Sequence, residues 1–432
     1  MENILIKNGR VLDPATNMDQ IADVWIVDGV IKEILPLSSD SMTVGNIEAD
    51  VVLDATGCFV MPGFIDLHVH LREPGFTYKE SVETGAKAAA HGGFTTILAM
   101  PNTKPTADNG EVIRLVHKKG EAVGSSRVLQ IGAITKGQEG QELADFSEMI
   151  RAGTPAVSED GKAVKDAALY LEGMKLAAAH GIPVLAHCED LSLVRGGVMN
   201  DDERARELGL PGITKAAENV IVARDIMLAK EAGVHLHLCH CSTLESVELA
   251  AFAKKSGICV TAEVCPHHFV LNSGDIPTDD GNFKMSPPLR TREDQEALKE
   301  GLKKGIIDVI ATDHAPHSPE EKNCSMKEAA FGIIGLETAA ALTMTELVEP
   351  GVLTPIQMAE KMSYNPAKIL KLDRGSLAES KVADVVVFDP RETYVIDAND
   401  SYSKSRNTPF AGKTVKGRVR ATIVGGRVVY ER

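Results

Sequence analysis

The feature that most constrains the fold is an alternation of short apolar runs with helical stretches between about residues 60 and 365. Eight apolar runs have the length of buried strands: 63–68, 94–99, 127–133, 155–158, 182–187, 234–239, 258–263 and 307–312. Helical stretches lie between them, for instance 79–91, 109–120, 164–180, 214–232, 244–256 and 292–304. Eight strands that alternate with helices are the number expected for an α/β fold of the (β/α)8 TIM-barrel type.

The two ends of the chain have a different pattern, with short β-like runs, turn signals and no helical period. Neither end has enough strands to close a core alone, so the simplest arrangement combines them, which also brings the termini together. We therefore expect a small composite β-sandwich module of residues 1–58 plus 366–432 and a catalytic barrel of residues 59–365. Gly425-Gly426 predicts a two-residue hairpin turn in that module.

Composition argues against several classes of partner. The chain of 432 residues has a net charge of -15 and no basic cluster, so we expect neither nucleic acid nor a membrane as a partner. No apolar run approaches the ~20 residues that span a bilayer, and the first residues lack the pattern of a signal peptide. The seven cysteines form no Cys-x-x-Cys pair, which is typical of reduced thiols in a cytoplasm.

Polar side chains follow the predicted strands at their carboxyl ends, where barrel enzymes carry their chemistry. His68 and His70 end the first strand, and the alternation of side chains turns both to the same side. Later strands end with four further candidate ligands: Asp160, His187, His240 and Asp313. Four imidazoles and two carboxylates are too many for one tetrahedral zinc ion but suit two ions that share a bridging carboxylate.

We expect two Zn²⁺ ions. The predicted ligands are His68, His70 and Asp313 for one ion, His187 and His240 for the other, and Asp160 as the bridge. A hydroxide between the ions would attack a carbonyl, and Asp313 would carry its proton to the leaving nitrogen. Lys162 is a minor alternative to Asp160 as the bridge.

Arg72 and Asn102 are candidates for recognition of an anion. Arg72 follows His70 by two residues and so lies on the same face of the chain, where a guanidinium can hold a carboxylate through two parallel hydrogen bonds. Asn102 ends the next strand and can assist. The alternative for Arg72 is an ion pair with Glu73 or Glu80.

Neighbours of these residues carry weaker expectations. Alternation should turn Glu189 away from the site. His267 and His268 follow the seventh strand, and we expect them to make hydrogen bonds around the metal ligands. The long polar segment Pro316–Lys327 follows the eighth strand and is expected to move as a lid when substrate binds.

These motifs together resemble type I dihydroorotases of the amidohydrolase superfamily. The resemblance covers nearly the whole chain and rests on His68-Val69-His70-Leu71-Arg72-Glu73-Pro74-Gly75, Met100-Pro101-Asn102-Thr103, Asp160-Gly161, His187-Cys188-Glu189, His240-Cys241-Ser242 and Asp313-His314-Ala315-Pro316-His317. It implies zinc-dependent, reversible cyclisation of N-carbamoyl-L-aspartate to (S)-dihydroorotate in pyrimidine biosynthesis, with Asp313 as the catalytic acid and base. It also suggests a homodimer and an association with aspartate transcarbamoylase.

The resemblance further implies a set of substrate contacts: His70, Arg72, Asn102, Ser286, His317, Phe331 and Gly332. Ser286 stands where the family usually has an asparagine, and its shorter hydroxyl has fewer donors, so that single contact departs from the pattern. The alternatives are a hydantoinase, dihydropyrimidinase or allantoinase, and a non-catalytic scaffold. Arg72 argues against enzymes that bind neutral rings, because an unpaired buried guanidinium is costly, and the complete ligand set argues against a scaffold.

Overall fold

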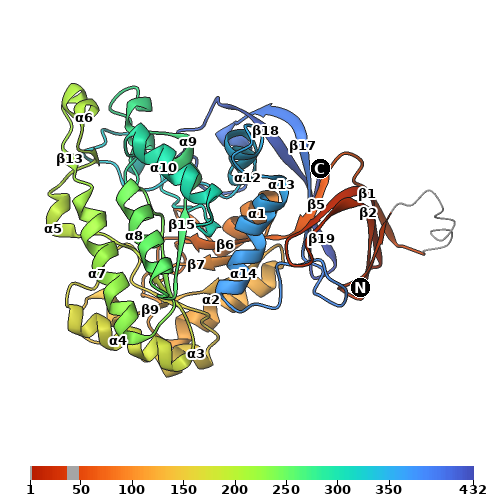
Figure 1. The fold of residues 1–432 in the computed structure, drawn as a ribbon, viewed down its shortest axis with the longest axis horizontal. Coiled ribbons are helices and arrows are strands. Elements are labelled where there is room, and N and C mark those ends of the chain that lie inside the picture. The colour runs from red at the N-terminus through yellow and green to blue at the C-terminus, as the bar shows by residue number, and fades with distance from the viewer. Residues whose placement is uncertain (1, 37–47) are drawn as a thin grey trace.

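The computed structural model describes residues 2–36 and 48–432, and it has a large helical part with a smaller β part at one end (Figure 1). The β part contains an eight-stranded sheet in the order β19-β18-β17-β5-β1-β2-β3, with β4 beside β1. Its strands are β1 (Ile4–Asp13), β2 (Met18–Val27), β3 (Val30–Pro36), β4 (Val51–Asp54), β5 (Phe59–Pro62), β17 (Val385–Val395), β18 (Thr414–Val424) and β19 (Arg427–Glu431). Both ends of the chain therefore contribute strands to one β-sandwich module, and both termini lie on its side of the molecule (Figure 1).

Strand β5 connects the two ends of the chain within this sheet. It pairs antiparallel with β17 and parallel with β1. Gly425 and Gly426 form the turn between β18 and β19, with φ of 55° and 72°, as a type I′ hairpin requires. The division into residues 1–58 plus 366–432 and residues 59–365 stays a prediction, and β5 lies just after its first boundary.

The larger part is a (β/α)8 barrel in which neighbouring strands are parallel. Its strands are β6 (Phe64–Val69), β7 (Phe94–Ala99), β8 (Arg127–Gln130), β9 (Gly132–Ala133), β10 (Val157–Ser158), β11 (Val184–Ala186), β14 (Leu236–Leu238), β15 (Val260–Val264) and β16 (Val309–Ile310). The third predicted strand is interrupted at Ile131, whose N–H donates to Ala99 O at 2.9 Å. The ring closes where His70 N donates to His314 O at 2.8 Å.

The six predicted helices are present, with ends shifted by a few residues: α1 (Val82–His91), α2 (Gly110–Val123), α4 (Ala167–His180), α7 (Ala216–Ala232), α8 (Leu244–Lys255) and α10 (Arg292–Lys303). The start of α1 moves from residue 79 because Ser81 and Thr84 form a capping box there. Short elements complete the fold: α3 (Phe146–Arg151), α5 (Leu191–Val194), β12 (Met199–Asn200), α6 (Glu203–Leu208), β13 (Gly212–Ile213), α9 (Pro266–Val270), α11 (Pro319–Lys322), α12 (Ala339–Thr343), α13 (Pro355–Ala359) and α14 (Asn365–Ile369). Among the described helices, none has the length and apolar character needed to cross a membrane.

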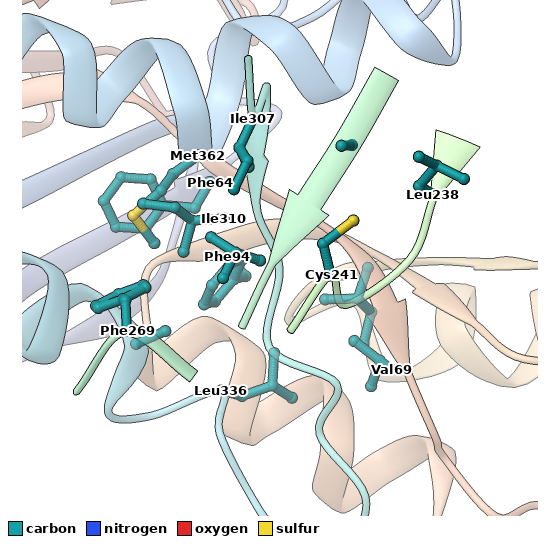
Figure 2. Close-up of a cluster of buried hydrophobic side chains, with 14 of the residues drawn as sticks. Phe64, Val69, Phe94, Leu238, Cys241, Phe269, Ile307, Ile310, Leu336 and Met362 are labelled. Carbon is teal, nitrogen blue, oxygen red and sulfur yellow. The ribbon is translucent and has the colours of Figure 1, made fainter. Parts of the chain in front are cut away.

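Buried apolar side chains hold the barrel strands in place (Figure 2). Phe64 and Phe94 begin neighbouring strands, and their ring centroids lie 5.7 Å apart in an edge-to-face arrangement. Ile310 and Met362 belong to the same buried cluster. Each such side chain stabilises the fold by about 1.5–3 kcal/mol. The carboxyl ends of the strands are therefore rigid supports for the polar residues that follow them.

Candidate metal centre and substrate pocket

The six predicted metal ligands meet at the carboxyl ends of the barrel strands. His68 lies in β6, and the others follow their strands within three residues: His70 after β6, Asp160 after β10, His187 after β11, His240 after β14 and Asp313 after β16. All six side chains are buried. The barrel thus brings together residues that are up to 245 positions apart in the chain.

Asp160 lies between the histidines. Its Oδ1 is 3.2 Å from His68 Nε2 and 3.4 Å from His187 Nδ1, and its Oδ2 is 3.4 Å from His70 Nε2. His240 Nε2 is 3.7 Å from Asp160 Oδ1. Lys162 Nζ instead donates to the backbone oxygen of Gln138 at 2.9 Å, away from the centre.

Three overlapping groups of potential ligands share His68; one of them adds Cys239 and Glu263, and the other two consist of predicted ligands. The ligand atoms of His68, His70 and Asp313 lie within 4.8 Å of one another, and so do those of His68, Asp160 and His240. Asp313 Oδ1 is 3.0 Å from His70 Nε2. His187 Nδ1 is 2.9 Å from His240 Nε2, which keeps the predicted second pair together.

The donor atoms fit a metal ion. His68 Nε2 and Asp160 Oδ1 are buried without a hydrogen-bond partner among the described residues, although they face each other at 3.2 Å. A buried polar atom without a partner is costly. Imidazole nitrogens and carboxylate oxygens are the ligands that zinc and related ions use in proteins. This centre is therefore a set of histidine and aspartate groups that could bind metal.

Both carboxylates of the centre are ionised at neutral pH. Burial by itself raises the pKa of Asp160, but His68 and hydrogen bonds from the surrounding histidines hold it well below its ordinary value. The same opposing effects act on Asp313. Burial raises its pKa, but His68 and His70 lower it by more, so the pKa lies below its ordinary value. An ionised carboxylate can bind a cation or accept a proton.

Glu263 supports the centre and was missing from the predicted site. Its Oε1 is 2.8 Å from His68 Nδ1, and its Oε2 is 2.9 Å from His237 Nε2. Because a carboxylate accepts, His68 Nδ1 carries a hydrogen, and this bond turns Nε2 toward Asp160. Burial raises the pKa of Glu263, yet hydrogen bonds from His237 and His68 lower it to about 2. An isolated glutamate within the apolar strand β15 was the available signal, because a buried charge requires a partner.

The predicted substrate contacts line one pocket beside this centre, with a volume of about 330 Å³. They are His70, Arg72, Asn102, Ser286, His317, Phe331 and Gly332. Arg72 Nε donates to Pro316 O at 3.1 Å. The alternative partners of Arg72 are engaged elsewhere, since Glu73 pairs with Lys119 and Glu80 with His314. Among the described residues, no carboxylate makes an ion pair with the Arg72 guanidinium.

Asn102 orients His70 as well as lining the pocket. Its Oδ1 accepts from His70 Nδ1 at 2.9 Å, which leaves His70 Nε2 facing Asp313. Ser286 donates to Glu189 Oε1 at 2.8 Å. The expectation that Glu189 points away was wrong: Glu189 lines the pocket, and its Oε2 is 3.4 Å from His187 Nε2. Regular alternation ends with β11 at Ala186, before Glu189, so it does not set this side chain.

His317, Phe331 and Gly332 also line the pocket, and His317 lies beside Arg72. His317 Nε2 lies 2.8 Å from Phe331 O, and Lys79 Nζ lies 3.2 Å from His317 Nδ1. Burial and the neighbouring Arg72 lower the pKa of His317 to about 2, so its ring is neutral. Because Lys79 can only donate, His317 Nδ1 accepts from it, and Nε2 carries the hydrogen that Phe331 O accepts; Arg72 Nη2 lies 3.2 Å from the same Nε2.

Lys322, in the predicted lid, was also missed. It is buried at 1% exposure, and its ammonium donates to the carbonyls of Lys284, Ala330 and Gly332 at 3.0, 2.8 and 2.8 Å. These carbonyls belong to the segments that carry Ser286 and Phe331. Lys322 thus ties α11 to two walls of the pocket.

Comparisons with known proteins agree with this geometry. A family described as "Dihydro-orotase-like" matches residues 57–246. A dihydroorotase of Acetivibrio thermocellus is 46% identical over 99% of this chain and 98% of its own length. One from Pelotomaculum thermopropionicum is 48% identical over 99% of this chain and 98% of its own length, and so is one from Listeria innocua.

Solved structures share the fold at lower identity. An L-hydantoinase from Arthrobacter aurescens has a TM-score of 0.88 and 27% identity, covering 100% of this chain and 96% of its own. A dihydropyrimidinase from Brevibacillus agri has a TM-score of 0.84 and 24% identity, with coverage of 99% and 95%. The second likeness concerns the fold alone.

Proposed function

The chain belongs to the dihydroorotase family, whose members are cyclic amide hydrolases, and on that premise we propose how its residues perform the reaction. The proposed reaction is the reversible cyclisation of N-carbamoyl-L-aspartate to (S)-dihydroorotate. The observation that supports a substrate with a carboxylate is the position of the Arg72 guanidinium. Arg72 has no carboxylate partner in the described chain and lies beside the histidine–aspartate centre.

We propose a centre of two zinc ions, the first held by His68, His70 and Asp313 and the second by His187 and His240, with Asp160 between them. Asp160 is suited to bridging because its two oxygens contact histidines on both sides, at 3.2–3.4 Å. When bound, the ions would activate water and polarise the amide carbonyl. Glu263 and Asn102 would orient His68 and His70 through their Nδ1 atoms.

Arg72 and Asn102 would anchor the substrate. A guanidinium can hold the substrate carboxylate by two parallel hydrogen bonds, with the amide of Asn102 as an additional donor. His317 would be the third contact of the carboxylate, since its ring lies beside Arg72, with Nε2 3.2 Å from Arg72 Nη2, and is positioned by Phe331 O. Ser286 already donates its hydroxyl hydrogen to Glu189, and so Ser286 would contact the substrate only as an acceptor.

Asp313 would carry the proton. It is ionised, buried and directed at His70 Nε2 at 3.0 Å, so it lies where the reacting atoms meet the centre. In ring opening it would accept a proton from the attacking water and deliver it to the leaving ring nitrogen. In ring closure it would perform the reverse transfers.

The test follows dihydroorotate by its ultraviolet absorbance, using protein as isolated, stripped with a chelator and restored with Zn²⁺. Turnover should disappear on stripping and return with zinc. Absence of turnover in a fully metallated sample would overturn the assignment. Hydantoin and dihydrouracil, assayed in parallel, would then identify a hydantoinase or dihydropyrimidinase.

We further propose a cytoplasmic homodimer and an association with aspartate transcarbamoylase. Free thiols support a reducing compartment, since all seven cysteines are unpaired. Exposed apolar side chains on adjacent helices support the dimer: Val220 and Met227 on α7 and Phe252 on α8. Sedimentation of the wild type and of Met227→Glu tests this surface, and equal sedimentation would exclude it. Co-sedimentation with purified aspartate transcarbamoylase tests the second partner.

A further inference from the structure

A separate buried cluster of potential metal ligands lies outside the proposed centre. It consists of Cys265, His267 and His268, where β15 passes into α9. The Cys265 sulfur and one ring nitrogen of each histidine lie within 4.8 Å of one another. The three residues are 0%, 2% and 2% exposed, and they do not line the substrate pocket.

The free nitrogens of this cluster resemble those of the proposed metal centre. Among the described residues, three imidazole nitrogens are buried without a hydrogen-bond partner: His68 Nε2, His267 Nε2 and His268 Nδ1. The first belongs to the centre described above, and the other two belong to this cluster. A histidine that only fills space would lose its hydration at these atoms without compensation.

The tautomer of His268 is set by a backbone carbonyl. His268 Nε2 lies 2.9 Å from Pro287 O, and because a carbonyl accepts, Nε2 carries the hydrogen. Nδ1 therefore holds the lone pair. A carbonyl on the far nitrogen is the usual support of a metal-bound histidine.

We propose that Cys265, His267 and His268 bind one thiophilic cation of the Zn²⁺ class, separate from the reaction centre. One sulfur and two neutral nitrogens suit zinc far better than magnesium or calcium, which prefer oxygen. On binding, the Cys265 S–H bond breaks, a sulfur–metal bond forms, and the proton passes to solvent. Three protein ligands leave a fourth position on the ion, which a water molecule would fill.

The experiment uses full-length protein stripped of metal and titrated with Co²⁺ and then Zn²⁺. Wild type should bind one more equivalent than Cys265→Ser and should show a thiolate-to-cobalt charge-transfer band that Cys265→Ser lacks. Cys239→Ser is the matched control, because Cys239 lies near His68 and Glu263 in another cluster. The band should survive that substitution.

A second variant guards against misfolding. In His268→Gln the side-chain amide can still donate to Pro287 O, but it has no ring nitrogen to bind the metal. This variant should therefore lose the charge-transfer band and bind one equivalent of metal less, while its circular dichroism spectrum stays that of wild type. Equal metal content in wild type and Cys265→Ser, or a band that disappears only in Cys239→Ser, would overturn the site. Dihydroorotate turnover is read separately, so failure of this site leaves the proposed function standing.

Discussion

At the residue scale, the most consequential side chain is Arg72. It is half-buried, it donates to Pro316 O, and its charge is left for a ligand. We expect Arg72→Met to lower kcat/KM for dihydroorotate roughly 100-fold, since a hydrogen-bonded charge contributes about 1.5–3 kcal/mol. Metal content, measured by atomic emission, should not change. A normal kcat/KM in this variant would show that Arg72 does not bind the substrate.

Glu263 contacts the predicted metal ligand His68 and does not line the substrate pocket. Replacing it with glutamine leaves the size of the side chain but removes the charge that fixes the hydrogen on His68 Nδ1. Glu263→Gln should weaken zinc binding by about 10- to 100-fold in a chelator competition. Glu218→Gln is the control, because Glu218 is also a buried carboxylate but binds Ser242 and Ser246. Equal affinities in both variants would contradict the role of Glu263.

At the element scale, Lys322 connects α11 to the pocket walls. Burial lowers its pKa to about 7, below that of an unfolded lysine. Between pH 7 and the ordinary lysine pKa of about 10.4, the unfolded chain therefore binds more protons than the folded chain, and this residue makes stability rise with pH. The free energy of unfolding of wild type, relative to Lys322→Met, should thus increase from pH 7 to about pH 10.

The same variant tests the lid. Methionine leaves the carbonyls of Lys284, Ala330 and Gly332 without their donor, and so the segment Pro316–Lys327 should become more sensitive to protease. Lys327→Met, an exposed lysine of the same segment, should leave the cleavage rate unchanged. The predicted closure on substrate binding requires, in addition, that substrate protect this segment in wild type.

At the scale of the whole molecule, the metal centre connects strands from all around the barrel. Its proposed ligands lie at the carboxyl ends of β6, β10, β11, β14 and β16, so the two proposed ions together would restrain five strands. Zinc in hundredfold excess over its Kd should stabilise the fold by about 2.7 kcal/mol per site. Calorimetry should therefore give a higher Tm for the zinc form than for the stripped form. Asp160→Ala should reduce that difference, and an unchanged difference would contradict bridging by Asp160.

The sequence by itself determined the barrel, the β-sandwich module and the positions of the histidines and aspartates. These depend on local patterns, namely runs of apolar residues, helical period and polar residues at strand ends, which are readable over a few neighbouring positions. Only the tertiary structure decided that Glu263 contacts His68, 195 residues away, that Glu189 faces the pocket, and that Lys322 is buried among carbonyls. The physical reason is that such contacts depend on how distant segments pack and on which buried charges find partners, and no local pattern encodes either.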